Sequence, residues 1–356
     1  MKNNITYLFG AGASYYACPI WKEQAKCMFN LHKVLKKTFT LEKGEERSLS
    51  INDKLIWEIS YYGKKALEFN TVDTYARKLF LADDRELESL KRAISNFFTI
   101  WSLTDNTEWK NLFYINDKKK IVERNEFIDH RYINLLASYL EKGSPLPTLR
   151  DNIKFISWNY DLQLESAYIK FCPLGIQDFI KGNKYFQFIP KDENSNLDVL
   201  HLNGYCGFFG EDEAYNLYKR SDSKNLNEII NEINFDVDPK NIKVHFDNYI
   251  NYSWDEKSVI ANNIRNQALN VMRNTDILVV VGYSFPPFNN SIDNVLIKAA
   301  RRLKKFVYQD PNANIDFIRE TFGIPKNKIS IINESLEQFF IPNYTFPENG
   351  IGGISF

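Results

Sequence analysis

The stretch ITYLFGAGAS, residues 5–14, joins an apolar run of strand length to a turn that contains two glycines. Gly10 and Gly12 can adopt backbone angles that are closed to other residues, and they allow a ligand to approach the main chain. A helical pattern begins about six residues after Ser14, and the start of a helix offers free N–H groups and a positive dipole end to a phosphate. The stretch is therefore a candidate pyrophosphate-binding turn of a dinucleotide site, although tight turns of many kinds use glycine.

Length and composition are those of an ordinary globular protein. The 356 residues can form one large domain or a core with an insertion, and 44% hydrophobic with 25% charged residues argue against wholesale disorder. Lys and Arg together number 45, as do Asp and Glu, so no overall field draws the chain to nucleic acid or anionic lipid. The densest basic runs, 118–120 and 301–305, are typical of solvated loops or helix ends. We therefore expect no direct binding to nucleic acid.

The cysteines and the apolar segments indicate a cytoplasmic protein with reduced thiols. No charged-then-apolar signal peptide precedes the first predicted strand, and no apolar run approaches the ~18 residues of a membrane span. We therefore expect no membrane partner. None of the four cysteines forms a C-x-x-C pair, which argues against a zinc site, and we expect no bound metal. These cysteines are Cys18, Cys27, Cys172 and Cys206.

A long helical stretch follows the first strand in place of a second strand. A helical period over residues 20–39 completes the opening half of a βαβ unit. Residues 41–150 then predict several helices separated by polar breaks, which we interpret as a helical insertion that covers one edge of the sheet. The predicted helices are Leu49–Leu67, Val72–Leu81, Glu86–Trp101 and Glu126–Leu140.

Strands and helices alternate from residue 153 onward, after a Gly- and Pro-containing linker over 143–147. The run ILVVV at 277–281 is continuously apolar, as in a strand that is buried on both faces of a parallel sheet. The alternation predicts an α/β fold with a Rossmann-like, doubly wound parallel sheet. The predicted strands are 153–157, 185–189, 199–202, 277–281, 306–308 and 329–332, and the predicted helices are 162–170, 258–273, 292–303 and 315–322. Residues 341–356 predict an extended tail, and 205–255 give no clear order.

Polar and glycine residues follow several of these strands directly. Ligands bind at the carboxyl ends of the strands in an open α/β sheet, so these residues form one candidate site. They are Gly10, Ala11, Gly12, Ser14, Asn159, Asp161, His201, Gly282, Ser284 and Asp310.

Each of these residues also has a purely structural explanation. Asn159 and Asp161 can cap the helix at 162–170, because both residue types are favoured at helix starts. His201 can be a hydrogen-bonded core histidine, and Gly282 can belong to an ordinary strand-to-helix turn. Asp310 can cap the helix that follows it.

Five short motifs, in the order G-A-G-A-S, N-Y-D, H-x-N-G, V-G-Y-S and D-P-N, resemble the sirtuin superfamily. The chain is most similar to the sirtuin-like NAD hydrolases of bacterial anti-phage defence systems. The resemblance extends from Phe9 to about Asn312 and implies a sirtuin-like domain over residues 1–340.

The resemblance implies NAD+ as the ligand and a role for each motif. One group would hold the pyrophosphate and ribose: Gly10, Ala11, Gly12, Ser14, Gly282 and Ser284. Asn159 and Asp161 would face the nicotinamide ribose and the carboxamide, and His201 would be the base. Asp310 and Asn312 would contact the adenosine ribose.

The departures from the family argue against protein deacylation. Ser157 and Trp158 replace the Thr and Gln of the deacylase motif, and the segment 18–21 lacks the family's arginine. Deacylases carry four zinc-binding cysteines between the motif histidine and the late strands, and this chain has only Cys206 there. The zinc module that helps form the acyl-lysine groove in deacylases is therefore missing. Tyr15 also breaks the G-x-G-x-x-G pattern of NAD-dependent dehydrogenases.

The resemblance therefore favours an NAD+ glycohydrolase that releases nicotinamide and ADP-ribose and depletes NAD in abortive infection. Such an activity needs gating, and the chain has no G-x-x-x-x-G-K-[ST] motif. We expect a separately encoded partner (an ATPase or a sensor) or a homo-oligomer, with residues 41–150 as the contact surface. Two alternatives stay open: an NAD-dependent deacylase or ADP-ribosyltransferase, and a non-catalytic sensor that binds NAD or ADP-ribose.

Overall fold

The computed structural model describes residues 2–43, 53–83, 85–103, 113, 126–172, 185–188, 196–207, 250–255, 258–334 and 336–342. Of the regions named above, most of 205–255 and nearly all of the tail at 341–356 lie outside these residues, as does the basic run 118–120. Within the described residues, no helix combines the length and apolar character needed to cross a bilayer.

Six parallel strands form the central sheet, and their order confirms the predicted Rossmann-like α/β fold. The strands are β1 (Ile5–Phe9), β4 (Ile153–Ser157), β5 (Val199–His201), β6 (Ile277–Val281), β7 (Lys305–Gln309) and β8 (Ile329–Ile332). Their spatial order is β5-β4-β1-β6-β7-β8, which corresponds to the 3-2-1-4-5-6 order of a doubly wound sheet. The chain winds outward in one direction from β1 and in the other from β6, so the topological switch point lies between these two central strands.

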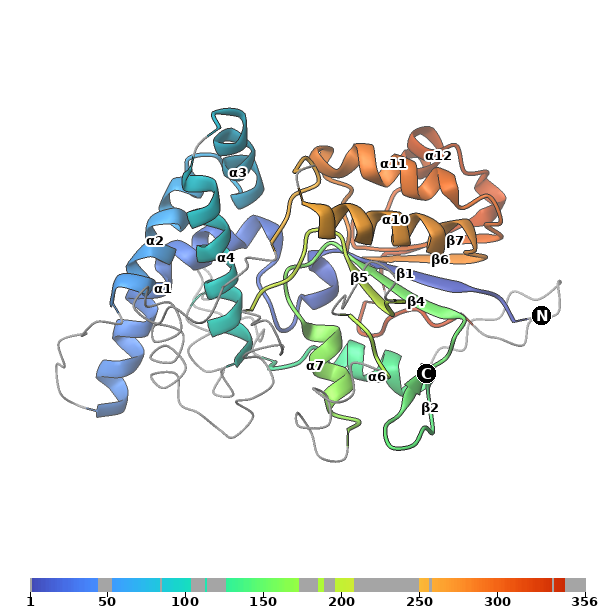
Figure 1. The fold of residues 1–356 in the computed structure, drawn as a ribbon, viewed down its shortest axis with the longest axis horizontal. Helices are drawn as coiled ribbons and strands as arrows, with labels where there is room; N and C mark the ends of the chain where they lie inside the picture. Colours follow the sequence, from blue (N-terminus) through green and yellow to red (C-terminus); the bar gives the residue numbers. More distant parts are fainter. Residues whose placement is uncertain are drawn as a thin grey trace.

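Alternating side chains of the strands pack into two apolar layers, one on each face of the sheet. Leu8, Ile156 and Val280 belong to the layer under α10 (Val259–Arg273), α11 (Asn290–Ala299) and α12 (Ile315–Phe322). Tyr7, Phe155 and Val279 belong to the layer on the other face, with side chains of α6 (His130–Tyr139) and α7 (Gln163–Ile169). Figure 1 shows these two helix layers on opposite sides of the sheet. The five apolar residues of β6 are all buried, as their continuous apolar run predicts.

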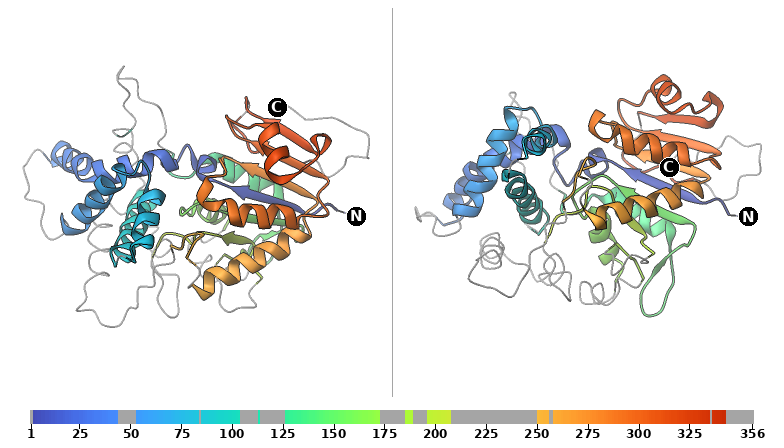
Figure 2. Two further views of the ribbon diagram at one scale, coloured as in Figure 1. Left: turned by 90° about the horizontal axis from the view of Figure 1, so that it is seen from above. Right: turned by 45° about the horizontal axis from the view of Figure 1, so that its top comes forward.

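Four helices form a group beside the sheet, beyond the carboxyl end of β1 (Figures 1 and 2). They are α1 (Trp21–Lys43), α2 (Asp53–Leu67), α3 (Val72–Leu81) and α4 (Glu86–Leu103), and we call them the helical group. Gly63 allows α2 to cross α1 closely, because a Cβ there would lie 2.2 Å from the backbone nitrogen of Phe29. The Trp101 indole donates a 2.7 Å hydrogen bond to the Ala17 carbonyl and ties α4 to the segment after β1. The helical group therefore shares one core with the sheet.

The region predicted as a helical insertion, 41–150, contributes to two places in the fold. Helices α2, α3 and α4 belong to the helical group, whereas α6 packs on the sheet face beside α7. Helix α6 begins at His130 rather than at Glu126, because the Asp129 carboxylate accepts the Arg131 N–H and caps the helix there. The linker at 143–147 joins an antiparallel pair, β2 (Leu140–Glu141) and β3 (Thr148–Leu149), that the sequence did not predict.

The predicted strand at 185–189 is wrong for its described part. Residues 185–188 form a turn, a bend and irregular backbone. Phe186 supplies the apolar signal by stacking on Tyr168, with ring centroids 4.5 Å apart. The Gln187 carbonyl accepts from both Asp198 and Val199, and its N–H donates to the Asp198 side chain. The segment thus pairs at the sheet edge without forming a regular ladder.

The turns after β1 and β6 touch through their glycines. Gly282 has φ +58°, and a Cβ there would lie 2.3 Å from the Ala13 nitrogen and 2.6 Å from the Gly12 Cα. A Cβ on Gly10 would lie 2.6 Å from the Gly282 carbonyl oxygen. The Gly12 N–H donates a 2.9 Å hydrogen bond to that oxygen, and the Gly10 N–H donates to Val281. These glycines therefore allow two strand ends to meet at the switch point.

Replacing Gly282 with alanine should destabilise the protein far more than the same change at Gly323. Gly323 has φ +70°, and no atom lies within 4 Å of the place that a Cβ would take, so Gly323→Ala carries only the left-handed backbone penalty, about 1–2 kcal/mol. Gly282→Ala adds a clash with backbone, and we expect a loss of ~3 kcal/mol or more. Denaturant unfolding of the two variants measures the difference. Equal losses would contradict the close contact between the turns.

Candidate functional site

A cavity of about 360 Å³ lies at the carboxyl ends of the central strands. Five of the predicted site residues line it: Ala11, Asn159, Asp161, Gly282 and Ser284. Asn203, from the H-x-N-G motif, lines it as well. The cavity thus lies at the topological switch point, where doubly wound folds bind their ligands. The first turn of α1 and the segment around the start of α3 also border it, so the helical group forms part of its wall.

The turn after β1 continues as a short 3-10 helix, Ala11–Ser14, before α1 begins at Trp21. The Ala13 N–H donates to the Gly10 carbonyl, and the Gly10 and Gly12 N–H groups donate to the β6 turn. The glycines of the predicted phosphate turn therefore use their small size to pack the two turns together, and Ala11 is the residue of this turn that lines the cavity.

Arg131 holds the β1 turn from the side of α6. Its Nη2 donates to the Gly12 and Ala13 carbonyls at 3.2 and 3.1 Å, and it pairs with the Asp129 carboxylate at 2.6 Å. Both side chains of this ion pair are buried, at 5% and 0% exposure, so the pair and the carbonyls satisfy each other away from water. Sequence reasoning missed Arg131, because it lies 118 residues from Ala13 and belongs to no motif.

Ser14 connects the two N-Y-D side chains behind the cavity wall. Its hydroxyl donates to Asp161 Oδ1 at 3.0 Å, and Asn159 Nδ2 donates to the same hydroxyl oxygen at 3.3 Å. The Tyr132 hydroxyl lies 3.2 Å from Ser14 Oγ. Ser14 itself is fully buried and does not line the cavity. In this structure it orients the amide and the carboxylate that do.

Asp161 also accepts a 3.2 Å hydrogen bond from the Gln163 N–H at the start of α7. The residue therefore contacts the start of the helix and lines the cavity at the same time. Burial raises the pKa of Asp161 to about 6, an effect that the hydrogen bonds from Gln163 and Ser14 partly offset. Asn159 makes no capping bond to α7: its side chain turns to Ser14 instead.

His201 lies behind the cavity wall, in a buried pair with Glu165. Its Nε2 is 2.7 Å from Glu165 Oε1, and its Nδ1 is 3.3 Å from the Asn159 carbonyl oxygen. Both side chains are almost fully buried, and neither lines the cavity. Burial lowers the pKa of His201, but the Glu165 carboxylate outweighs this effect, and the pKa is raised overall. In this arrangement, His201 contacts the backbone of Asn159 and not the cavity itself.

The residues after β6 and β7 separate into two groups. Gly282 and Ser284 line the cavity. Asp310 does not line it: its Oδ1 accepts the Asn312 N–H at 2.8 Å and so shapes its own turn. Burial raises the pKa of Asp310. The structure therefore brings residues of the motifs after β1, β4, β5 and β6 to one cavity and leaves the D-P-N segment outside its lining.

Trp158, which replaces the Gln of the deacylase motif, has a defined role in the cavity wall. Its indole N–H donates to Asp293 Oδ1 at 3.2 Å, and the Tyr283 hydroxyl donates to Asp293 Oδ2 at 2.8 Å. Burial raises the pKa of Asp293 to about 8. The Trp158 and Tyr283 rings are stacked, with centroids 6.0 Å apart. These contacts join the turns after β4 and β6 with α11.

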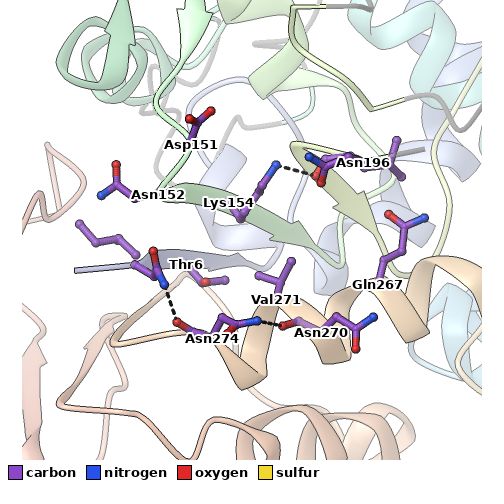
Figure 3. Close-up of a pocket in the computed structure, with 12 residues that line it drawn as sticks. Thr6, Asp151, Asn152, Lys154, Asn196, Gln267, Asn270, Val271 and Asn274 are labelled. Carbon is purple, nitrogen blue, oxygen red and sulfur yellow. Dashed lines mark hydrogen bonds between the residues drawn. The ribbon is translucent and has the colours of Figure 1, made fainter. Parts of the chain in front are cut away.

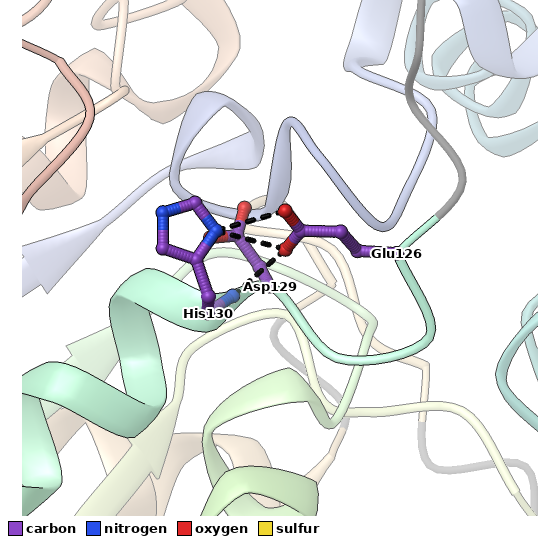
Figure 4. A group of neighbouring side chains, drawn as sticks. All are labelled: Glu126, Asp129 and His130. Carbon is purple, nitrogen blue, oxygen red and sulfur yellow. Dashed lines mark hydrogen bonds and ion pairs between the residues drawn. The ribbon is translucent and has the colours of Figure 1, made fainter.

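One group of potential metal ligands occurs among the described residues, away from this cavity: Glu126, Asp129 and His130 (Figure 4). Its carboxylates already have partners. Glu126 accepts from the His130 N–H and faces His130 Nδ1 at 2.8 Å, and Asp129 pairs with Arg131. These contacts belong to the start of α6, and both carboxylates have partners within the protein without an ion.

A second cavity, of about 410 Å³, lies at the opposite, amino edge of the sheet (Figure 3). Amide side chains dominate its lining, among them Asn152, Asn196, Gln267 and Asn270. None of the predicted site residues lines it.

Because the charge of Asp161 is buried, Asp161→Asn should stabilise the protein at neutral pH. Folding raises the pKa of Asp161 from 3.8 to about 6. The protonated side chain therefore contributes fully to stability below the unfolded pKa, and this contribution is lost as the pH rises through about 6. Asn retains the acceptor for Ser14 and Gln163. We expect a gain of up to ~3 kcal/mol at pH 7.5 and little change at pH 4, measured by denaturant unfolding. The same difference at both pH values would contradict the buried charge.

A scan against protein-family models gives no match for this chain, and a search of the curated proteins gives none either.

Proposed function

We propose that this protein is an NAD+ glycohydrolase with a sirtuin-like site. The observation that carries the proposal is the meeting of Asn159, Asp161, Gly282 and Ser284 around one cavity at the switch point of a doubly wound sheet. The motifs that resemble those of sirtuin-like NAD hydrolases are far apart in the chain, and four of the five reach this cavity with at least one residue.

The reaction we propose breaks the bond between the nicotinamide nitrogen and C1′ of the ribose. The bonding electrons leave with nicotinamide, and an oxocarbenium-like ribose forms. Water then adds to C1′ and loses a proton, which yields ADP-ribose. Asn159 would orient the ribose or the water, and Asp161 would hold the carboxamide. Ser14 supports both by its hydrogen bonds to the two side chains.

Backbone groups would carry the pyrophosphate in this proposal. The cavity is bordered by Ala11 and Gly282, and by the first turn of α1 at Trp21 and Gln24. The start of a helix attracts phosphate through its free N–H groups and its dipole.

The buried His201–Glu165 pair supports a positioning role for His201 in this reaction. The ring contacts the Asn159 carbonyl rather than the cavity, so His201 would set the direction of the Asn159 side chain. A role as general base, which the family resemblance implies, would require the ring to leave Glu165 or to act through a neighbour.

NAD depletion in anti-phage defence, gated by a partner or by oligomerisation, is part of the proposal. The helical group borders the cavity, so a movement of these helices would change the site directly. Helix α2 also carries two exposed aromatic side chains, Trp57 and Tyr61, at 55% and 46% exposure. These features support residues 41–150 as the region where an activating protein or second copy would act.

Asn159→Ala should lower the rate of nicotinamide release from NAD+ by about 10²-fold or more, in the range typical of lost catalytic groups. Asn196→Ala is the matched control, because it truncates an exposed asparagine at the opposite cavity. Chromatography of nicotinamide and ADP-ribose measures both variants, alone and with the products of neighbouring genes. Wild-type turnover in Asn159→Ala would refute the site, and binding of NAD+ by the native chain without any nicotinamide release would favour a sensor.

Two substitutions at His201 separate positioning from proton transfer. His201→Ala should abolish NAD cleavage, since Asn159 loses its backbone contact and Glu165 loses its partner. His201→Gln keeps an N–H donor but cannot take up a proton, so it should retain kcat within about tenfold of the native value if His201 positions Asn159. Circular dichroism checks that both variants fold. A folded His201→Gln that is as inactive as His201→Ala would contradict the positioning role and support a base.

A further inference from the structure

The helical group contributes one acidic side chain to the cavity, Asp73 in the first turn of α3. The Thr71 side chain accepts the Thr74 N–H and caps the helix, which places Asp73 at the cavity wall. Asp73 Oδ1 accepts a 2.9 Å hydrogen bond from the Tyr160 hydroxyl. Tyr160 lies between Asn159 and Asp161 in the chain, so this bond joins the helical group to the part of the wall that carries the N-Y-D motif.

The side chains around the cavity are acidic and aromatic. Asp73 and Asp161 are the charged residues in its lining, and within the described part of the chain no Lys, Arg or His lines it. Aromatic rings from five parts of the chain supply apolar surface: Trp21, Phe69, Phe98, Trp158 and Phe288. Tyr160 occupies one oxygen of the Asp73 carboxylate, and the described residues provide no hydrogen-bond donor to the other.

This combination of groups fits a flat organic cation. A carboxylate attracts a positive charge strongly when little water lies between them, and aromatic faces bind delocalised and quaternary cations. A neutral ligand of the same shape would gain the aromatic contacts and lose the charge attraction. Burial also raises the pKa of Asp73, so its carboxylate is poorly solvated, and a bound cation would stabilise its charged form.

We propose that Asp73 is a specificity-determining residue that selects a positively charged pyridinium ring over its neutral counterpart. The identity of the ring as the nicotinamide of NAD+ rests on the function proposed above. The charge selection itself rests on the cavity. Recognition then requires α3 to be in place, since the selecting carboxylate belongs to the helical group and not to the sheet.

Two small probes of nearly equal size test the charge selection without turnover. 1-Methylnicotinamide is a cation, and nicotinamide is neutral. We expect the native protein to bind the cation at least tenfold more tightly, measured by calorimetry. Asp73→Asn keeps an oxygen for the Tyr160 hydroxyl and should bind both probes with similar, weak affinity. The affinity for nicotinamide should change by less than about twofold.

Glu68→Gln is the matched control, because it removes one negative charge from the exposed turn before α3, outside the cavity lining. It should retain the preference for the cation. Thermal unfolding checks that each variant folds. Equal affinity of the native protein for the two probes, failure to bind either one, or an unchanged preference in a folded Asp73→Asn would overturn the inference. If the native protein prefers the cation but releases no nicotinamide from NAD+, the proposed reaction fails and the charge selection stands.

Discussion

The contact between the turns after β1 and β6 is the constraint on which the site depends. Gly282 adopts a left-handed backbone conformation and lies against Gly12 and Ala13, at distances that leave no room for a Cβ. The two central strands of a doubly wound sheet can place their ends side by side because the turns themselves interlock. The cavity lies next to this contact, and Ala11 from the β1 turn and Ser284 from the β6 turn both line it.

Buried charged groups surround this contact, and each has a partner. Arg131 neutralises Asp129 while it binds the carbonyls of the β1 turn, and Glu165 faces His201. Breaking such a pair is costly, because it leaves one charge buried without compensation. Asp161 differs, since its burial is offset mainly by hydrogen bonds from Gln163 and Ser14, and its pKa is still raised. A carboxylate kept charged in a cavity wall at a cost in stability is typical of a site that binds or transforms a ligand.

The helical group is structurally part of the site rather than an appendage to the fold. It shares its core with one face of the sheet, and it supplies Asp73 to the cavity. The hydrogen bond between Asp73 and Tyr160 connects the two parts at the point where the ligand would lie. In the function that we propose, any protein or second copy that shifts α3 would alter ligand recognition. This gives a physical route by which binding on the helices could control the chemistry.

Local patterns determined the elements of this protein, because apolar periodicity and strand-end glycines act over a few residues. The strand at 277–281 and the helix at 315–322 lie where the sequence predicted them, and the alternation was sufficient to predict the Rossmann-like sheet. Which side chains face the cavity was decided by the tertiary structure, since that depends on contacts between distant segments. His201 lies beside Glu165, a residue in no motif, and Asp73 reaches the site from a helix that periodicity alone marks only as amphipathic. Contacts between residues that are distant in the chain do not show in the local spacing of the sequence. The burial and the partners that such contacts create determine whether a side chain faces the cavity.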